Sequence, residues 1–127
     1  LMGYRSYVGY ILAFPTKKAR DAFVAVHRFK SNEVVQELDQ LEETGAQILA
    51  FTASCVKWYE DYDDVKIHEE FMRTCVDHFD GAYRFARTGE ESGDVEEISE
   101  GDEDLYELCD VYVHSTVVIN TEPVDSY

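Results

Sequence analysis

The chain has 127 residues, of which 45% are hydrophobic, and a formal net charge of −16 at pH 7. This composition, with nine tyrosines and seven phenylalanines, is that of a globular protein and excludes a disordered tail. The length predicts one domain, residues 1–127, large enough to fold without disulfides or metals.

The first half of the chain predicts two strands and one clear helix. Residues 4–14 are rich in aromatic and β-branched side chains, which predicts a strand whose second half is buried on both faces. Thr16 is a suitable N-cap for a helix over residues 17–30. Residues 33–43 fit a helix or a strand, and we favour a strand in their first part; residues 47–58 predict the second clear strand. The predicted buried stripe of the first helix is Ala19, Ala22, Phe23, Val26 and Phe29.

The second half predicts another amphipathic helix, followed by strands. Asp63 or Asp64 is expected to cap this helix, and Gly81 to end it. Residues 82–88 predict a short strand, residues 95–98 a brief one and residues 105–119 a long final strand. Residues 90–104 are expected to form an acidic loop or hairpin, residues 1–3 to be a cloning remnant or frayed, and residues 120–127 to fray. The predicted stripe of the second helix is Val65, His68, Phe71, Met72, Cys75, Val76 and Phe79.

A repeated tetrapeptide indicates the fold class. The sequence Ile-Leu-Ala-Phe occurs at residues 11–14 and again at residues 48–51, each time in a predicted strand that leads to a helix. Two such halves predict an α+β, ferredoxin-like two-layer sandwich: an antiparallel sheet of four to six strands with two amphipathic helices on one face. The final strand is expected to extend this sheet. Coincidence in a chain rich in Val, Ile and Phe is the alternative explanation of the repeat.

The negative charge lies entirely in the second half of the chain. Residues 1–60 carry no net charge, whereas residues 61–127 contain twenty acids and four bases. Residues 90–110 alone hold eleven acids and no base. This asymmetry predicts an interaction surface, and it excludes direct binding of nucleic acid or anionic lipid through this half.

Motifs for chemistry are missing from the sequence. The four histidines form no close-spaced ligand pair, and no glycine-rich phosphate loop occurs. Cys55, Cys75 and Cys109 lie among apolar neighbours, which predicts buried, reduced thiols. Residues 83–87 resemble the aromatic strand motif of RNA-recognition domains, but the motif's glycine is missing and the adjacent acids would repel RNA. We therefore predict no catalytic residue, no metal and no cofactor.

These observations favour a protein that acts by binding another protein. We predict an inhibitor or modulator of a nucleic-acid-handling enzyme or complex, of the type that phages encode against host defences. It would present carboxylates where its basic partner expects phosphates. No signal peptide or membrane span is visible, so we expect a cytoplasmic protein. The predicted partner-binding residues are Glu90, Glu91, Asp94, Glu96, Glu97, Glu100, Asp102, Glu103, Asp104, Tyr106 and Glu107.

Two other classes of function remain open on the sequence. The first is a small-ligand-binding or enzymatic α+β domain, with a pocket between sheet and helices that contains Arg84, Arg87 and His114. Such a domain could be a homodimer formed across the sheet. The second is a structural protein that assembles through its final strand.

Overall fold

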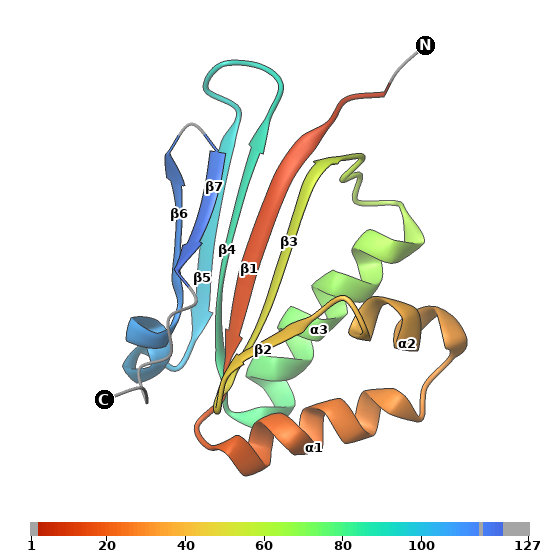
Figure 1. Ribbon diagram of the computed structural model, residues 1–127, viewed down its shortest axis with the longest axis vertical. Helices are drawn as coiled ribbons and strands as arrows, with labels where there is room; N and C mark the ends of the chain where they lie inside the picture. The colour runs from red at the N-terminus through yellow and green to blue at the C-terminus, as the bar shows by residue number, and fades with distance from the viewer. Residues whose placement is uncertain (1–2, 115, 121–127) are drawn as a thin grey trace.

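The protein is α+β and has three layers. The computed structural model describes residues 3–114 and 116–120; residues 1–2 and 121–127, which include most of the predicted tail, lie outside the described residues. A five-stranded sheet in the order β2-β3-β1-β4-β5 forms the middle layer, and all its strand pairs are antiparallel (Figure 1). Its strands are β1 (Ser6–Ala13), β2 (Glu42–Gly45), β3 (Ile48–Val56), β4 (Ala82–Gly89) and β5 (Val95–Gly101).

The two copies of the repeated tetrapeptide pair with each other in the centre of the sheet. Leu12 of β1 lies opposite Leu49 of β3, and Ile11 lies opposite Ala50. Because side chains alternate along a strand, Leu12 and Leu49 face the helices whereas Ile11 and Ala50 face the other side. All four are buried. The repeat therefore reflects two neighbouring strands that are apolar on both faces.

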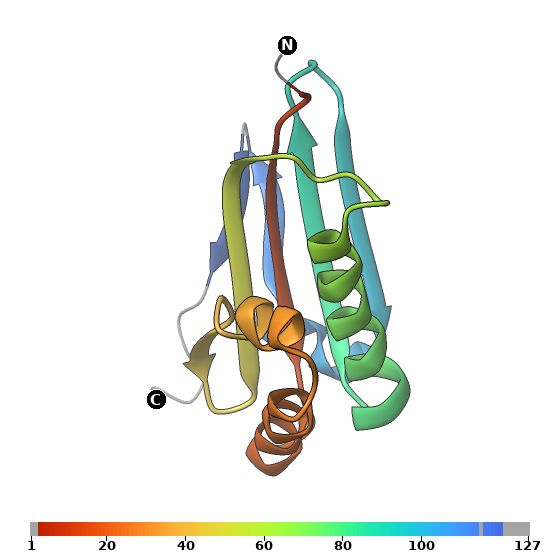
Figure 2. The same cartoon turned by 90° about the vertical axis from the view of Figure 1, so that its right-hand side faces the viewer.

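Three α-helices, rather than the two predicted, cover one face of the sheet (Figure 2). They are α1 (Lys17–Arg28), α2 (Asn32–Leu38) and α3 (Asp63–Phe79). The prediction of a strand at the start of residues 33–43 is wrong, because Ser31 caps a helix there by accepting a hydrogen bond from the Val34 N–H. Leu38 anchors α2 in the core, and the strand β2 follows only at Glu42.

The N-cap of α1 is confirmed, but its predicted buried stripe is wrong. Thr16 accepts a hydrogen bond from the Ala19 N–H at 3.0 Å. Phe23 is fully buried, whereas Val26 is 49% and Phe29 90% exposed. Ala22 is exposed as well. The helix crosses the lower end of the sheet in Figure 1, so that only a narrow side of it contacts the core.

The predicted buried stripe of α3 is confirmed, but both of its ends differ from the prediction. Tyr62, which makes no side-chain cap, precedes the helix, and both Asp63 and Asp64 lie inside its first turn. At the other end Asp80, rather than Gly81, adopts the left-handed conformation, with φ of 56°. Gly81 is required for a different reason, since a Cβ atom there would lie 2.5 Å from the Ala13 carbonyl oxygen.

A β-hairpin and a short helix cover the second face of the sheet, where a long strand extending the sheet was expected. The segment forms η1 (Glu103–Leu108), β6 (Asp110–His114) and β7 (Thr116–Asn120), and β6 pairs only with β7 (Figure 1). Cys109 and Val111 pack there against Ile11 and Ala86. An added edge strand would have left these apolar side chains in water, and the hairpin covers them instead.

A buried polar chain joins the helices to the sheet. The hydroxyl of Tyr10 donates to Nδ1 of His68 at 2.6 Å, and Nε2–H of His68 donates to a carboxylate oxygen of Glu37 at 2.9 Å. This neutral tautomer satisfies both ring nitrogens. Tyr10 and His68 are buried, so the chain links β1, α3 and α2 through the core. A second buried histidine, His27, donates from Nδ1–H to the carbonyl oxygen of Phe23 at 2.7 Å.

Acidification below pH 6.5 is expected to destabilise the fold through these two histidines. Burial lowers the pKa of both His27 and His68 from the usual 6.5, although Glu37 acts in the opposite direction on His68. The unfolded chain therefore binds more protons below that pH, and stability decreases as the pH falls. Each histidine contributes at most about 1.4 kcal/mol per pH unit. Urea unfolding at pH 7.5, 6.5 and 5.5 measures this, and a free energy of unfolding that is constant over the range would contradict it.

Candidate functional site

The pairing of β4 with β5 decides which acidic side chains face the helices. Glu96 lies opposite Arg87, and Glu100 lies opposite Tyr83. Since Tyr83 belongs to the core on the helix side, Glu96 and Glu100 project to that side as well. Glu97, the residue after Glu96, projects to the other face of the strand.

The predicted acidic residues run along one edge of the sheet. β5 is the last strand in the sheet order, and its Cα atoms span about 20 Å from Val95 to Gly101 at the usual rise per residue. We call the following ten residues the acidic edge. They are Glu90, Glu91 and Asp94 in the turn before β5; Glu96, Glu97 and Glu100 on β5; and Asp102, Glu103, Asp104 and Glu107 in or beside η1.

Three residues of the acidic edge already pair with arginines of the same chain. Arg87 contacts Asp94 at 2.7 Å and Glu96 at 3.2 Å, and Arg73 of α3 contacts Glu100 at 3.3 Å. The hydrogen bond from Arg87 lowers the pKa of Asp94. Asp94 also accepts a hydrogen bond from the Tyr4 hydroxyl at 2.6 Å, so it ties the β4–β5 turn to the start of β1.

The predicted anchor Tyr106 lies on the hairpin side of the sheet. The guanidinium of Arg84 sits 6.0 Å from the centroid of its ring, and Arg84 also donates to the Cys109 carbonyl oxygen at 3.3 Å. Arg84 thus holds η1 against β4, and its predicted place in a pocket between sheet and helices is wrong. Arg87 does face the helix side, and the side chain of His114 lies outside the described residues.

A cleft of about 510 Å³ lies between α3 and the β4–β5 hairpin. Its floor is apolar and contains Trp58, Tyr83 and Phe85. We call it the α3–β5 cleft. Charged side chains line it on both sides: Glu60, Glu69 and Arg73 from the segment before α3 and from α3 itself, and Arg87, Asp94, Glu96 and Glu100 from the hairpin. Five carboxylates and two guanidiniums give these seven residues a net charge of −3.

Glu69 is the carboxyl group of the cleft whose pKa is raised. Burial raises its pKa, and the negative charges of Glu60 and Glu96 raise it further, while Lys66 lowers it slightly. Within the described part of the chain, neither Glu60 nor Glu69 makes an ion pair. Glu60 and Glu69 therefore repel each other, and no cation of the described residues contacts either carboxylate.

Trp58 and Glu60 are the cleft residues that sequence reasoning missed. Trp58 follows the end of β3, and Glu60 lies in the connection to α3. A local indication existed, because the only tryptophan of the chain stands two residues before an acidic turn. The proximity of Glu69 to β5 depends on how α3 packs on the sheet.

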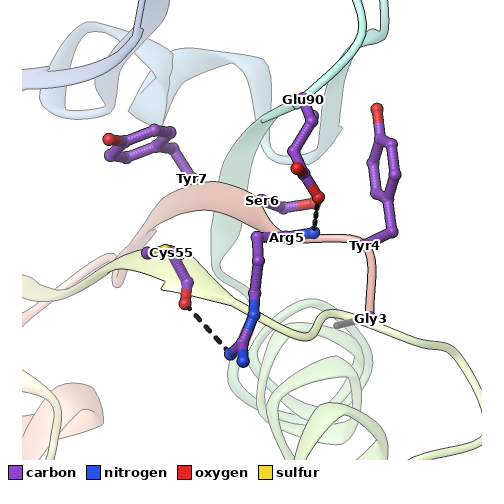
Figure 3. Close-up of a pocket in the computed structure, with 8 residues that line it drawn as sticks. Gly3, Tyr4, Arg5, Ser6, Tyr7, Cys55 and Glu90 are labelled. Carbon is purple, nitrogen blue, oxygen red and sulfur yellow. Dashed lines mark hydrogen bonds between the residues drawn. The ribbon is translucent and has the colours of Figure 1, made fainter. Parts of the chain in front are cut away.

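A larger depression, of about 890 Å³, opens where β1 begins and β3 ends (Figure 3). Glu90 accepts a hydrogen bond from the backbone N–H of Arg5, whose guanidinium reaches the Cys55 carbonyl oxygen. Cys55 is exposed and has a φ of 58°, so the prediction that all three cysteines are buried is wrong. The other two are buried. Burial raises the pKa of the Cys75 thiol well above its usual value and raises the pKa of the Cys109 thiol to about 12, which makes both poor nucleophiles.

The chain matches no family model, no curated protein and no solved structure. The described residues contain no group of three metal-ligating side chains that could hold an ion. No helix formed by these residues is both long and apolar enough to span a membrane. The acidic edge and the α3–β5 cleft are therefore the features on which a function can be based.

Proposed function

We propose that this protein binds a basic protein partner through the acidic edge and so inhibits or modulates a nucleic-acid-handling enzyme or complex. The observation that carries the proposal is the run of ten carboxylates along the edge strand and its two ends. A DNA duplex carries about one phosphate charge per 1.7 Å of axis, so ten carboxylates correspond in number to about 17 Å of duplex. The acidic edge extends beyond β5 at both ends, so its charge has the same sign as that of DNA and a lower density. Such a surface attracts a positive groove over a distance and favours fast association.

The edge position of β5 also supports binding by side chains rather than by strand pairing. A second strand that added to β5 would approach Glu96, Glu97 and Glu100 on an already acidic strand. Charged side chains on edge strands oppose such pairing. The carboxylates thus discourage self-assembly through this edge and leave it open to a cationic surface.

We further propose that the core of the fold is ferredoxin-like. The order β4-β1-β3-β2, with helices connecting β1 to β2 and β3 to β4, supports this arrangement. In this reading the β4–β5 hairpin, η1 and the β6–β7 hairpin are additions to that core. The acidic edge would then be a feature of the added C-terminal region.

Neutralising three residues of the acidic edge that form no ion pair within the described ranges is expected to weaken capture of the partner about tenfold at low salt, at roughly 0.5 kcal/mol per exposed charge. The edge variant carries Glu91→Gln, Asp104→Asn and Glu107→Gln. The control variant, Glu33→Gln, Asp39→Asn and Glu42→Gln, removes the same charge from α2 and β2. Each protein is immobilised, exposed to cell lysate and eluted with a salt gradient, and the eluted proteins are identified by mass spectrometry.

The proposal requires that nucleic-acid-binding proteins elute from the wild type and the control but are depleted with the edge variant. Equal capture by all three proteins, with the same salt dependence, would contradict it.

The α3–β5 cleft favours a second candidate, a small-ligand-binding domain, because its volume is typical of ligand pockets. A neutral ligand would raise the melting temperature by an amount that hardly depends on ionic strength.

A further inference from the structure

The floor of the α3–β5 cleft presents an aromatic ring held in a fixed position. Trp58 is half-buried, and its ring lies 6.2 Å from Phe85, 6.2 Å from Phe51 and 5.8 Å from His68 between centroids. These neighbours restrict the indole before any ligand arrives. A preorganised ring contributes contact area without a further loss of side-chain entropy on binding.

The carboxylates beside this ring come from separate elements. Glu60 precedes α3, Glu69 lies on its second turn and Glu96 lies across the cleft on β5. They are near enough to one another that Glu60 and Glu96 raise the pKa of Glu69. A guanidinium placed between them would relieve this repulsion and would donate hydrogen bonds to the carboxylates.

The chain itself shows how a guanidinium is held in this cleft. Arg87 lies on one wall, where Asp94 and Glu96 contact its nitrogens at 2.7 and 3.2 Å. This arrangement uses Asp94 and Glu96 but leaves Glu60 and Glu69 without an ion pair in the described part of the chain. Arg73 of α3, the other guanidinium of the cleft, contacts Glu100 instead. The cleft therefore has a further position for a positive charge, beside Glu60 and Glu69.

We propose that the α3–β5 cleft receives an arginine side chain of the basic partner, with its guanidinium stacked on Trp58 and bonded to Glu60 and Glu69. This inference rests on the proposed function and names the residue that anchors the partner. Arginine fits better than lysine because its planar guanidinium stacks on aromatic rings and donates hydrogen bonds to two carboxylates at once. The acidic edge would guide the partner, and the cleft would hold one side chain of it.

The only tryptophan of the chain provides a direct test, since its fluorescence reports on the cleft alone. The probes are the capped tripeptides Gly-Arg-Gly, Gly-Lys-Gly and Gly-citrulline-Gly, titrated at constant ionic strength. We expect a saturable change of Trp58 emission with the arginine peptide, a weaker affinity for the lysine peptide and none for the citrulline peptide. Equal responses to arginine and lysine, or no saturable response to arginine, would overturn the proposal.

Matched single substitutions then separate the cleft from the general negative field. Glu69→Gln is expected to weaken binding of the arginine peptide about five- to tenfold, as for the loss of one charged hydrogen bond, and Glu60→Gln to have a similar effect. Glu33→Gln, which removes the same charge from α2, should leave the affinity unchanged. All three side chains are exposed, so the variants should retain the melting temperature of the wild type. Equal weakening by Glu69→Gln and Glu33→Gln would overturn the assignment of the site.

The peptide titration tests the cleft assignment and the lysate experiment tests the role of the acidic edge, so either proposal can be wrong while the other stands. If the arginine peptide does not bind but the edge variant loses its partners, the cleft assignment is wrong and the acidic edge still carries the function. If the arginine peptide binds with the expected dependence on Glu69 but the edge variant captures partners normally, the proposed role of the edge is wrong and the cleft assignment stands.

Discussion

Replacing Phe23 with alanine is expected to lower the free energy of unfolding by about 3 to 5 kcal/mol, the usual cost of removing a large buried aromatic ring. Phe23 is completely buried, and its ring centroid lies 5.2 Å from that of Phe14, 6.0 Å from Phe71 and 5.5 Å from Phe79. These neighbours come from the end of β1 and from α3. The cavity left by this substitution would therefore lie where α1 packs against both the end of β1 and α3.

The matched control is Phe29→Ala, which removes another phenylalanine ring six residues further along the chain. Because Phe29 is 90% exposed, this change should alter the free energy of unfolding by less than about 0.5 kcal/mol. Guanidinium chloride unfolding, with the denaturant slope compared between variants, measures both effects. Similar losses for Phe23→Ala and Phe29→Ala would show that α1 packs on the stripe predicted from the sequence.

Replacing His68 with leucine is expected to lower the free energy of unfolding by about 3 kcal/mol. The change leaves the Tyr10 hydroxyl buried without an acceptor, which costs about 1 to 3 kcal/mol. It also removes a ring that lies 4.2 Å from Phe51 and 5.6 Å from Phe71 between centroids, so packing is lost as well. Glu37 loses its bond to His68 and keeps one from the Gln40 side chain at 3.2 Å.

The second variant in this test is Tyr10→Phe, introduced alone and together with His68→Leu. Replacing both partners of a buried hydrogen bond by apolar groups is nearly neutral, so the double variant should recover about 1 to 2 kcal/mol relative to His68→Leu. Urea unfolding of all four proteins gives the coupling energy. Strictly additive losses would mean that the hydrogen bond between Tyr10 and His68 contributes nothing. With His68→Leu, the free energy of unfolding should also decrease less between pH 6.5 and pH 5.5 than it does in the wild type.

The local pattern of the sequence determined the elements whose two faces differ clearly. The buried stripe of α3 from Val65 to Cys75 could be predicted because the other faces of this helix carry charged side chains such as Glu69 and Arg73. The two strands with the repeated tetrapeptide were predicted for the same reason, since so apolar a segment must be buried on both faces. Thr16 was predicted as a cap because its interaction extends over only three residues.

Where the local sequence allows two structures of similar energy, tertiary contacts determine which one forms. Apolar residues occur on more than one side of α1, and contact with Phe14 and Phe71 selects the side that contains Phe23. Residues 105–119 fit one long strand by composition. They form η1 and a hairpin because the second face of the sheet, with Ile11 and Ala86, needs a cover. No local pattern contains that requirement.

The same distinction between local sequence and tertiary structure applies to the candidate site. The sequence determined that the second half of the chain is strongly acidic and that the acids concentrate in residues 90–110. Only the pairing of β4 with β5 placed Glu96 on the helix side, and only the packing of α3 brought Glu69 to the same cleft. Charge is a property of composition and can be counted. A cleft depends on contacts between residues far apart in the chain, which the fold as a whole determines.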